Sequence, residues 1–343
     1  MKYSIIIAVY NRLHEVRELL SSAEKMPFPR EAFEFLFVDD GSSDGFKEYI
    51  ESYESLSGLQ IRAIYQQNQG PGSARNYGMQ EAKGDYFIFV DSDCMFPPEW
   101  LEEIDKHLVQ NAWDAFGGPD AAHDSFSPLI KAINYSMTSF LGTGGTRGSK
   151  NHVGKFYPRS FNMGISREVY EKIGGMNKLR HGQDMDYSAR IYQAGFKVGL
   201  IPEAFVYHKR RTSLKKFFKQ IFNWGVARIN LGTTHPELLK PVHFLPSAIL
   251  LAYLILFILS GLTPFLHLLF KLVLLGHMLV SLVAFFQAFF QYKQIKVALF
   301  SLCTLNIQVF AYGSGLLYAV LQKLLGRKEA KGFVKNYYGE KKK

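Results

Sequence analysis

The segment Tyr86–Cys94 (YFIFVDSDC) places two carboxylates directly after a run of apolar and aromatic residues. The run Tyr86–Val90 predicts a strand that is buried on both faces of a sheet. Asp91 and Asp93 stand two residues apart, so both carboxylates can reach one cation at the end of that strand. Hard oxygen ligands of this kind suit Mg2+ or Mn2+. An Asp-x-Asp triplet alone is common in solvated turns, and its place after this strand favours the metal site.

Strands and helices alternate on both sides of this segment. Further apolar runs predict strands at Ser4–Val9, Phe33–Val38 and Ile61–Tyr65. Helical spacing and turn signals predict helices near 13–20, 46–53, 71–82 and 98–109. This alternation predicts an α/β fold with a mostly parallel sheet and flanking helices. Ligands bind such sheets at the carboxyl ends of the strands, and three polar clusters are predicted there: Tyr10-Asn11, Asp39-Asp40 and Asp91/Asp93.

Charge and hydropathy divide the chain. Residues 1–204 contain 21 Lys and Arg against 27 Asp and Glu, a net charge of −6, whereas the whole chain carries +10, so the remainder carries +16. Basic residues beside apolar spans typically mark the cytoplasmic face of a membrane and its anionic lipids. We therefore expect membrane lipids, and no nucleic acid, as partners of this charge. Two cysteines provide no disulfide framework.

Four regions follow from this division: an α/β domain at 1–204, a juxtamembrane segment at 205–241, about three transmembrane helices at 242–325 and a basic tail at 326–343. Basic and aromatic residues mix in Phe205–Trp224, which predicts an amphipathic helix in the membrane interface, or one that packs on the first domain. The apolar segments are predicted at Phe244–Leu262, Phe265–Phe290 and Val297–Leu321. A third full pass would place the basic tail outside, so the third segment is alternatively re-entrant, with a break at 313–315.

Three further segments are candidates for the site. Gln67–Gly78 contains a Gly-Pro-Gly turn before a helix, whose exposed N–H groups favour an anion, and Arg75 could pair with phosphate. Asp184 could accept a proton from an acceptor hydroxyl, or it could simply cap a helix. His208 follows a strand-like run and is structural unless the fold brings it to the metal. Gly142–Ser160, rich in glycine and basic residues, is predicted to be a mobile loop or a solvated linker.

Together these segments resemble the family-2 inverting glycosyltransferases with a GT-A fold. The resemblance covers about residues 3–225 and depends on six segments in a specific order. They are SIIIAVYNR, VDDGSSDG, NQGPGSARNYG, YFIFVDSDC, FNMGISREVYEKIGG and GQDMDYSARIYQAG. The resemblance implies that residues 1–204 form a nucleotide-sugar-binding catalytic domain.

The resemblance also implies a role for each matching residue. Asp91, Asp93 and His208 would hold the metal and the diphosphate, and Asp184 would be the general base. The nucleotide would contact Ala8, Tyr10, Asn11, Asp39, Asp40 and Arg75. The sugar and the acceptor would lie beside Asn162, Gly164 and Asp186.

The sequence departs from the family pattern at three places. Ala8 stands where the family often has Pro, and Gln183 where it often has Glu. Gln220–Trp224 (QIFNW) has Asn where processive members carry Arg in a Q-x-x-R-W signature. We therefore expect a non-processive enzyme.

The expected activity is inverting, metal-dependent transfer of a sugar from a nucleoside diphosphate donor, a UDP-sugar, to a lipid-linked or cell-surface glycan. The expected location is the inner cell membrane, with several passes and a cytoplasmic catalytic domain. Two alternatives remain. A nucleotidylyltransferase uses a similar sheet and a metal but needs no anchor, and a non-catalytic membrane scaffold would bind the sugar nucleotide without using Asp184.

Overall fold

The computed structural model describes residues 1–144 and 155–333. These residues divide into two compact units, each of which is described by itself. The first unit contains residues 1–123 and 155–209, and the second contains 124–144 and 210–333. Most of the predicted loop at 142–160, and of the basic tail, lies outside the described residues.

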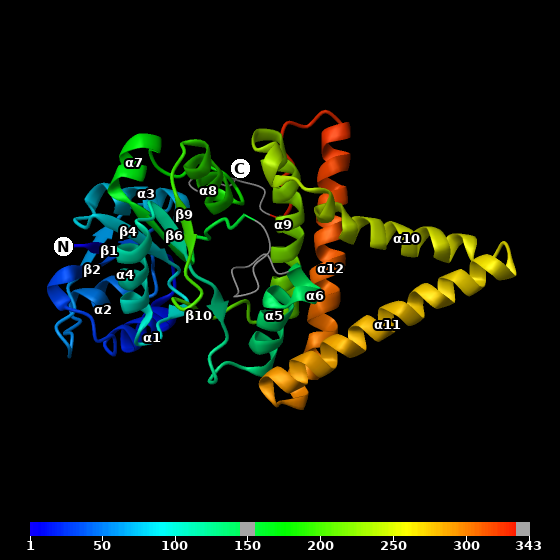
Figure 1. Cartoon of the computed structure of the whole chain (residues 1–343), viewed down its shortest axis with the longest axis horizontal. Helices are drawn as coiled ribbons and strands as arrows, with labels where there is room; N and C mark the ends of the chain where they lie inside the picture. The colour runs from blue at the N-terminus through cyan, green and yellow to red at the C-terminus, as the bar shows by residue number, and fades with distance from the viewer. Residues whose placement is uncertain (145–154, 334–343) are drawn as a thin grey trace. The chain divides into compact units, whose positions relative to one another are not determined.

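A seven-stranded sheet forms the centre of the first unit, in the order β3-β2-β1-β4-β8-β6-β9 (Figure 1). The strands are β1 (Tyr3–Val9), β2 (Phe33–Asp39), β3 (Ile61–Tyr65), β4 (Tyr86–Val90), β6 (Ala115–Gly117), β8 (Asn162–Ser166) and β9 (Val198–Leu200). Strand β1 is parallel to β2 and β4, and β2 is parallel to β3. Strand β8 is antiparallel to both of its neighbours, β4 and β6. The predicted mostly parallel sheet is confirmed.

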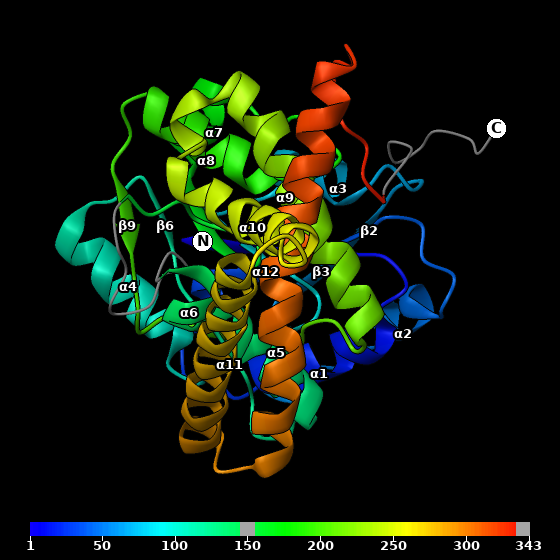
Figure 2. The same ribbon diagram turned by 90° about the vertical axis from the view of Figure 1, so that its right-hand side faces the viewer.

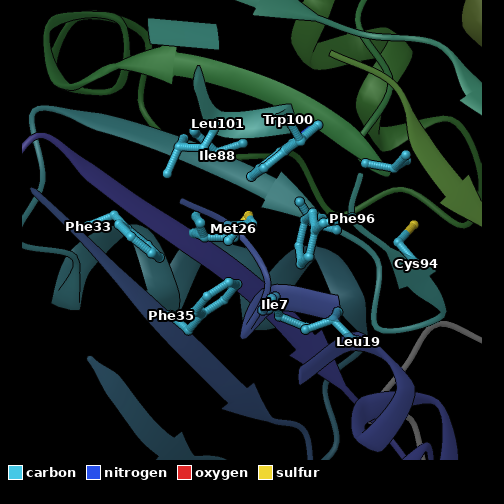
Figure 3. Packing of buried hydrophobic residues seen from close by; sticks show 14 of the residues in the cluster. Ile7, Leu19, Met26, Phe33, Phe35, Ile88, Cys94, Phe96, Trp100 and Leu101 are labelled. Atoms are coloured by element: carbon cyan, nitrogen blue, oxygen red, sulfur yellow. The ribbon is translucent and has the colours of Figure 1, made fainter. Parts of the chain in front are cut away.

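Helices cover both faces of this sheet. One face carries α1 (Leu13–Ala23), α2 (Phe46–Glu51) and α4 (Trp100–Asn111), with a short 3-10 helix η1 (Arg30–Ala32) before β2. The other face carries α3 (Pro71–Glu81), α7 (Arg167–Ile173) and α8 (Gln183–Gln193). Side chains alternate along β1, so that Ile5 and Ile7 join the first core and Ile6 the second. In Figure 3, Ile7, Leu19 and Phe35 pack in the first of these cores.

A second, three-stranded sheet lies in the same unit. Its strands are β5 (Cys94–Met95), β10 (Val206–His208) and β7 (Asp120–Ala121), with β10 in the middle. Strand β10 is antiparallel to β5 and parallel to β7. This sheet therefore brings the end of the unit's chain beside the segment that follows β4.

The second unit is helical. Its helices are α5 (Pro128–Thr138), α6 (Phe140–Thr143), α9 (Leu214–Thr234), α10 (Leu245–Leu259), α11 (Pro264–Tyr292) and α12 (Ile295–Leu324), with 3-10 helices η2 (Pro236–Leu238) and η3 (Pro241–Phe244). Three helical segments, at 241–259, 264–292 and 295–324, are long and apolar enough to cross a membrane. Helix α12 continues through Gly313–Gly315, so the predicted break there is wrong. Figure 2 shows α11 beside the lower part of α12.

Helices α9 and α12 pack closely because glycines face the partner backbone. A Cβ atom on Gly315 would lie 2.0 Å from the carbonyl oxygen of Phe222, and one on Gly225 would lie 2.2 Å from that of Tyr312. Small residues allow apolar helices to approach in this way. The predicted helix at Phe205–Trp224 begins only at Leu214, because residues 206–208 form β10. Its apolar face packs against α12.

Candidate functional site

The turn after β4 brings Asp93 to His208. The Cys94 N–H donates to the Asp91 carbonyl oxygen at 3.0 Å, which closes the turn. Strand β10 pairs His208 with Cys94, and the Lys209 N–H donates to the Asp93 carbonyl oxygen at 2.8 Å. As a result, His208 Nε2 lies 3.2 Å from Asp93 Oδ1. The fold therefore unites a carboxylate and an imidazole that are far apart in sequence.

This pair fits a divalent metal. Ligand atoms of Asp93, Cys94 and His208 lie within 4.8 Å of one another, which is the one such group among the described residues. Cys94 is fully buried, and burial raises the pKa of its thiol. We therefore assign the ligands to the carboxylate and the imidazole. Two ligand atoms that are each about 2.1 Å from an octahedral ion lie about 3 Å apart, close to the observed separation.

Asp91 is paired differently. Its Oδ1 lies 2.7 Å from Nη2 of Arg75, and the Asp91 side chain stays about one-third exposed (32%). Arg75 is only 7% exposed and comes from α3. The predicted trio of metal residues is thus divided, with Asp93 on His208 and Asp91 on a guanidinium. The guanidinium of Arg75, which was predicted to contact phosphate, therefore lies at the carboxyl end of β4.

The carboxyl end of β2 is closed by its two aspartates. Asp40 is 3% exposed, and its Oδ1 and Oδ2 accept the N–H groups of Gln69 and Gly70, both at 2.8 Å. Asp39 is also buried, and its Oδ1 accepts the Ser42 N–H at 3.0 Å. Asp40 therefore fixes the turn before α3, and it positions the helix that carries Arg75.

The loop after β1 is tied to the loop after β2. Asn11 has a left-handed backbone (φ 53°), and its Oδ1 accepts the Ser43 N–H at 2.8 Å. The Leu13 N–H, at the start of α1, donates to Oδ2 of Asp44 at 2.8 Å. Tyr10 is 50% exposed at the same edge of the sheet. Hydrogen bonds therefore hold together the two loops after β1 and β2, and the Tyr10 side chain beside them is open to solvent.

Ala8 is the remaining predicted nucleotide residue. It lies in β1, is partly buried and packs against the core below α3. Its contact with the nucleotide stays a prediction.

Helix α8 presents Asp184 in its first turn. The N-cap position is Gly182 (φ 79°), without a side-chain cap, so Asp184 does not have the alternative role of N-cap. Gln183 Nε2 donates to the Leu179 carbonyl oxygen at 3.1 Å, and a Cβ atom on Gly72 would lie 2.5 Å from that nitrogen. The start of α8 therefore lies against the start of α3. Asp184 is partly exposed, and its Oδ1 accepts only the neighbouring Met185 N–H among the hydrogen bonds observed.

The three residues predicted to contact sugar and acceptor are buried inside the fold. Asn162 Nδ2 donates to the Ala204 carbonyl oxygen at 2.7 Å, and a Cβ atom on Gly164 would lie 2.1 Å from the Phe116 ring. Asp186 Oδ2 accepts from Arg190 Nε at 3.1 Å and from an Asn177 amide at 3.0 Å. All three side-chain positions therefore have a structural role in the fold, and their contact with sugar or acceptor stays a prediction.

Sequence reasoning missed two neighbours of His208. Asp120 Oδ2 lies 3.5 Å from His208 Nδ1, and the ring of Phe161 lies 5.2 Å from the imidazole. The weak signal for Asp120 was a carboxylate directly after the turn residues Gly117-Gly118-Pro119. Only the pairing of β7 with β10 shows its place.

Fold and site together define a GT-A-like α/β protein with a candidate divalent-metal site at the carboxyl edge of its sheet. Residues 4–174 match the family model described as "Glycosyl transferase family 2". The chain therefore contains a family 2 glycosyltransferase domain and belongs among the enzymes of that family. The family that the sequence resembles is confirmed.

Named relatives agree with this assignment, and a solved structure shares the fold. The chain is 28% identical over 270 residues to "Glycosyltransferase AglE" of Haloferax volcanii, which covers 71% of this chain and 83% of AglE. It is 36% identical over 144 residues to "Poly(ribitol-phosphate) beta-N-acetylglucosaminyltransferase TarS" of Staphylococcus aureus, which covers 39% of this chain but only 25% of TarS. The structure of the mannosyltransferase PcManGT from Pyrobaculum calidifontis, in complex with GDP-Man and Mn2+, has a TM-score of 0.61 at 15% identity and covers 89% of this chain and 86% of that one. That likeness shows a shared fold.

Proposed function

We propose that this protein is a membrane-anchored, inverting, non-processive glycosyltransferase. It transfers one sugar from a UDP-sugar to a hydroxyl of a lipid-linked or cell-surface glycan. The observation that carries the proposal is the Asp93–His208 pair, with a separation of 3.2 Å, beside the Arg75–Asp91 ion pair at the end of the same strand. Carboxyl ends of parallel strands are where such folds bind nucleotides.

The residues divide the work between donor and acceptor. Asp93 and His208 would hold Mn2+ or Mg2+, whose charge stabilises the diphosphate as it leaves. Asp39, Tyr10 and the edge of β1 at Ala8 would contact the nucleoside, with Asn11 and Asp40 holding the loops that shape this pocket. Arg75 pairs with Asp91, so that the anionic donor would not meet the uncompensated charge of that carboxylate.

Asp184 would act on the acceptor. In an inverting reaction the hydroxyl attacks the anomeric carbon from the face opposite the diphosphate, and a carboxylate removes its proton as the bond forms. Asp184 suits this role because it is partly exposed, whereas Asp186 in the same turn is 2% exposed and paired with Arg190.

The second unit supplies the anchor in this proposal. Its three apolar helices would hold the enzyme in the inner cell membrane, where a lipid-linked acceptor lies, with the first unit in the cytoplasm. Lys215, Lys216 and Lys219 are exposed in the first turns of α9 and would meet anionic lipid headgroups. Nucleotide sugars on the cytoplasmic side fit this orientation.

The test is release of the free nucleoside diphosphate. The purified full chain is incubated with Mn2+ and a panel of UDP-sugars, with GDP-mannose as a second base. A transferase releases UDP as it passes the sugar to an acceptor or, slowly, to water. A nucleotidylyltransferase, given pyrophosphate, converts the UDP-sugar to UTP and sugar 1-phosphate without UDP, and a scaffold binds without turnover. Asp93→Ala should lower UDP release by about a hundredfold or more, because metal stabilisation contributes several kcal/mol. Unchanged UDP release by Asp93→Ala in excess EDTA would refute the metal assignment.

A further inference from the structure

We propose that Asp120 is a positioning residue, which acts through His208 and aims its Nε2 lone pair at the metal. This inference rests on the proposed metal dependence of the enzyme. Nothing in the family motifs contains Asp120, and its place is visible only in the three-stranded sheet.

Strand β10 lies between the two carboxylates. Asp93 precedes β5 on one side, and its Oδ1 lies 3.2 Å from His208 Nε2. Asp120 begins β7 on the other side, where it pairs with Val206, and its Oδ2 lies 3.5 Å from His208 Nδ1. Each nitrogen of the imidazole thus faces a different carboxylate, while the Phe161 ring packs against the imidazole at 5.2 Å.

The two nitrogens of a neutral imidazole have different roles, so the contacts of His208 with Asp93 and Asp120 are not equivalent. A neutral imidazole has one N–H and one lone pair, on different nitrogens. The Oδ2 of Asp120, 3.5 Å from Nδ1, is at ion-pair distance, and its negative charge stabilises an N–H at Nδ1; the lone pair is then at Nε2, on the side of Asp93. Metal-binding histidines commonly donate their second N–H to a carboxylate in this way. Asp120 therefore selects the tautomer in which His208 can bind the ion with Asp93.

Burial argues against a direct contact of Asp120 with metal or substrate. The Asp120 side chain is 0% exposed, whereas those of Asp93 and His208 are each 15% exposed. Asp120 faces Nδ1, the nitrogen turned away from Asp93, and it is outside the group of close ligand atoms found in the described residues. A buried carboxylate costs free energy unless it is paired, and the imidazole of His208 is one partner of Asp120.

The informative variant is Asp120→Asn. An Asn amide at this position can donate its NH2 to Nδ1, which would move the ring N–H to Nε2 and block the lone pair needed for metal. The same exchange of Asp for Asn disturbs the tautomer of a catalytic histidine in serine proteases. Loss of an outer partner typically weakens metal binding by about tenfold to a hundredfold.

Glu34→Gln is the matched control. Glu34 is a carboxylate of the same unit with a side chain only 1% exposed, and it pairs with Arg62 at 2.8 Å and with the Ser4 hydroxyl at 2.6 Å. Burial alone would raise the pKa of Glu34, but the hydrogen bonds from Ser4 and Arg62 outweigh it and lower that pKa. The control therefore removes a buried, ionised carboxylate that does not contact the metal residues.

The experiment measures Mn2+ binding to the full chain in detergent by electron paramagnetic resonance, together with spin-echo modulation from imidazole 14N. Wild type and Glu34→Gln should show 14N coupling and equal Mn2+ affinity. Asp120→Asn should bind Mn2+ about tenfold to a hundredfold more weakly and lose that coupling. If Asp120→Asn does not fold, Asp120→Ala, which removes both the charge and the acceptor, is measured and should also weaken Mn2+ binding about tenfold or more.

Two results separate this inference from simpler accounts. In a His208→Ala background, Asp120→Asn should change Mn2+ affinity by less than about twofold, because its route to the metal has been removed. Equal weakening in both backgrounds, or full affinity with intact 14N coupling in Asp120→Asn, would overturn the role of Asp120 while the metal site stands. A wild-type chain without 14N coupling would refute the metal assignment itself, and this inference with it.

Discussion

Of the two carboxylates in the first turn of α8, Asp184 should matter for the transfer rate and Asp186 for the stability of the fold. Asp184→Asn keeps the size of the side chain and an oxygen that can accept the Met185 N–H, but it cannot take a proton. We expect the transfer rate to fall by about a hundredfold to ten-thousandfold, the usual contribution of a general base. The midpoint of thermal unfolding should stay within about 2 °C, because little stability depends on this contact.

Asp186→Asn should show the opposite pattern. Its carboxylate accepts from Arg190 Nε at 3.1 Å and from Asn177 at 3.0 Å, while Arg190 also donates to the carbonyl oxygens of Ile173 and Gly175. A hydrogen bond to a charged group contributes about 1.5–3 kcal/mol, and Asn retains one acceptor, so we expect a loss of about 2 kcal/mol. In a unit of this size that corresponds to a midpoint about 4–8 °C lower.

The assay pairs UDP release at saturating donor with thermal unfolding of the same preparations. UDP affinity in Mn2+ should change by less than about threefold in Asp184→Asn, since no donor contact is lost. The reasoning fails if Asp186→Asn abolishes transfer at an unchanged unfolding midpoint while Asp184→Asn transfers normally. That result would move the base by two residues along α8. Normal turnover by both variants would place the catalytic base elsewhere.

Three further outcomes are expected. Gly315→Leu should lower the thermal midpoint of the detergent-solubilised chain by several degrees, because its Cβ would collide with the α9 backbone, whereas Gly276→Ala, with open space around it, should not. Glu34→Gln should make the free energy of unfolding depend less on pH in acid. The lowered pKa of this carboxylate stabilises the fold above about pH 4.3, and that stability is lost as the pH falls through the folded-state pKa. Denaturant titrations from about pH 3 to 7 would show the difference. In cells, with the exposed native cysteine replaced by serine, Ser260→Cys in the α10–α11 connection should react with an impermeant thiol reagent from outside and Asn111→Cys only after the cells are opened; labelling of Asn111→Cys in intact cells would contradict the proposed orientation.

Local sequence patterns were enough to predict the half of the sheet nearest the N-terminus. The strands at Ile61–Tyr65 and Tyr86–Val90 have the predicted bounds, because continuous apolar runs are a direct sign of burial on both faces. Strand β8 was not predicted, and neither was its antiparallel direction. The ring of Phe116 packs against Gly164, in the space that a Cβ atom would need, and the sequence motif gave no sign of this packing. Pairing between distant strands decides this, and one sequence does not reveal it.

The candidate site was predicted unevenly for the same reason. Asp91 and Asp93 were found because both follow one strand, and the resemblance supplied His208. Their division between Arg75 and His208 depends on which helix and which strand approach the turn. Asp120 lies in a two-residue strand without a pattern of its own. A partner of this kind becomes visible only when β7, β10 and β5 are placed side by side.

Residues 124–144 belong to the second unit although they lie within the sequence of the first, and this limits how the chain can be truncated. A fragment that ends at Lys209 would keep α5, whose Ile133 and Met137 are buried against Phe217 and Ala311 of the deleted part. Such a fragment would carry a bare apolar helix into water and would tend to aggregate. A water-soluble version of the first unit therefore needs two deletions: the C-terminal helices, and the internal stretch 124–144 replaced by a polar connection.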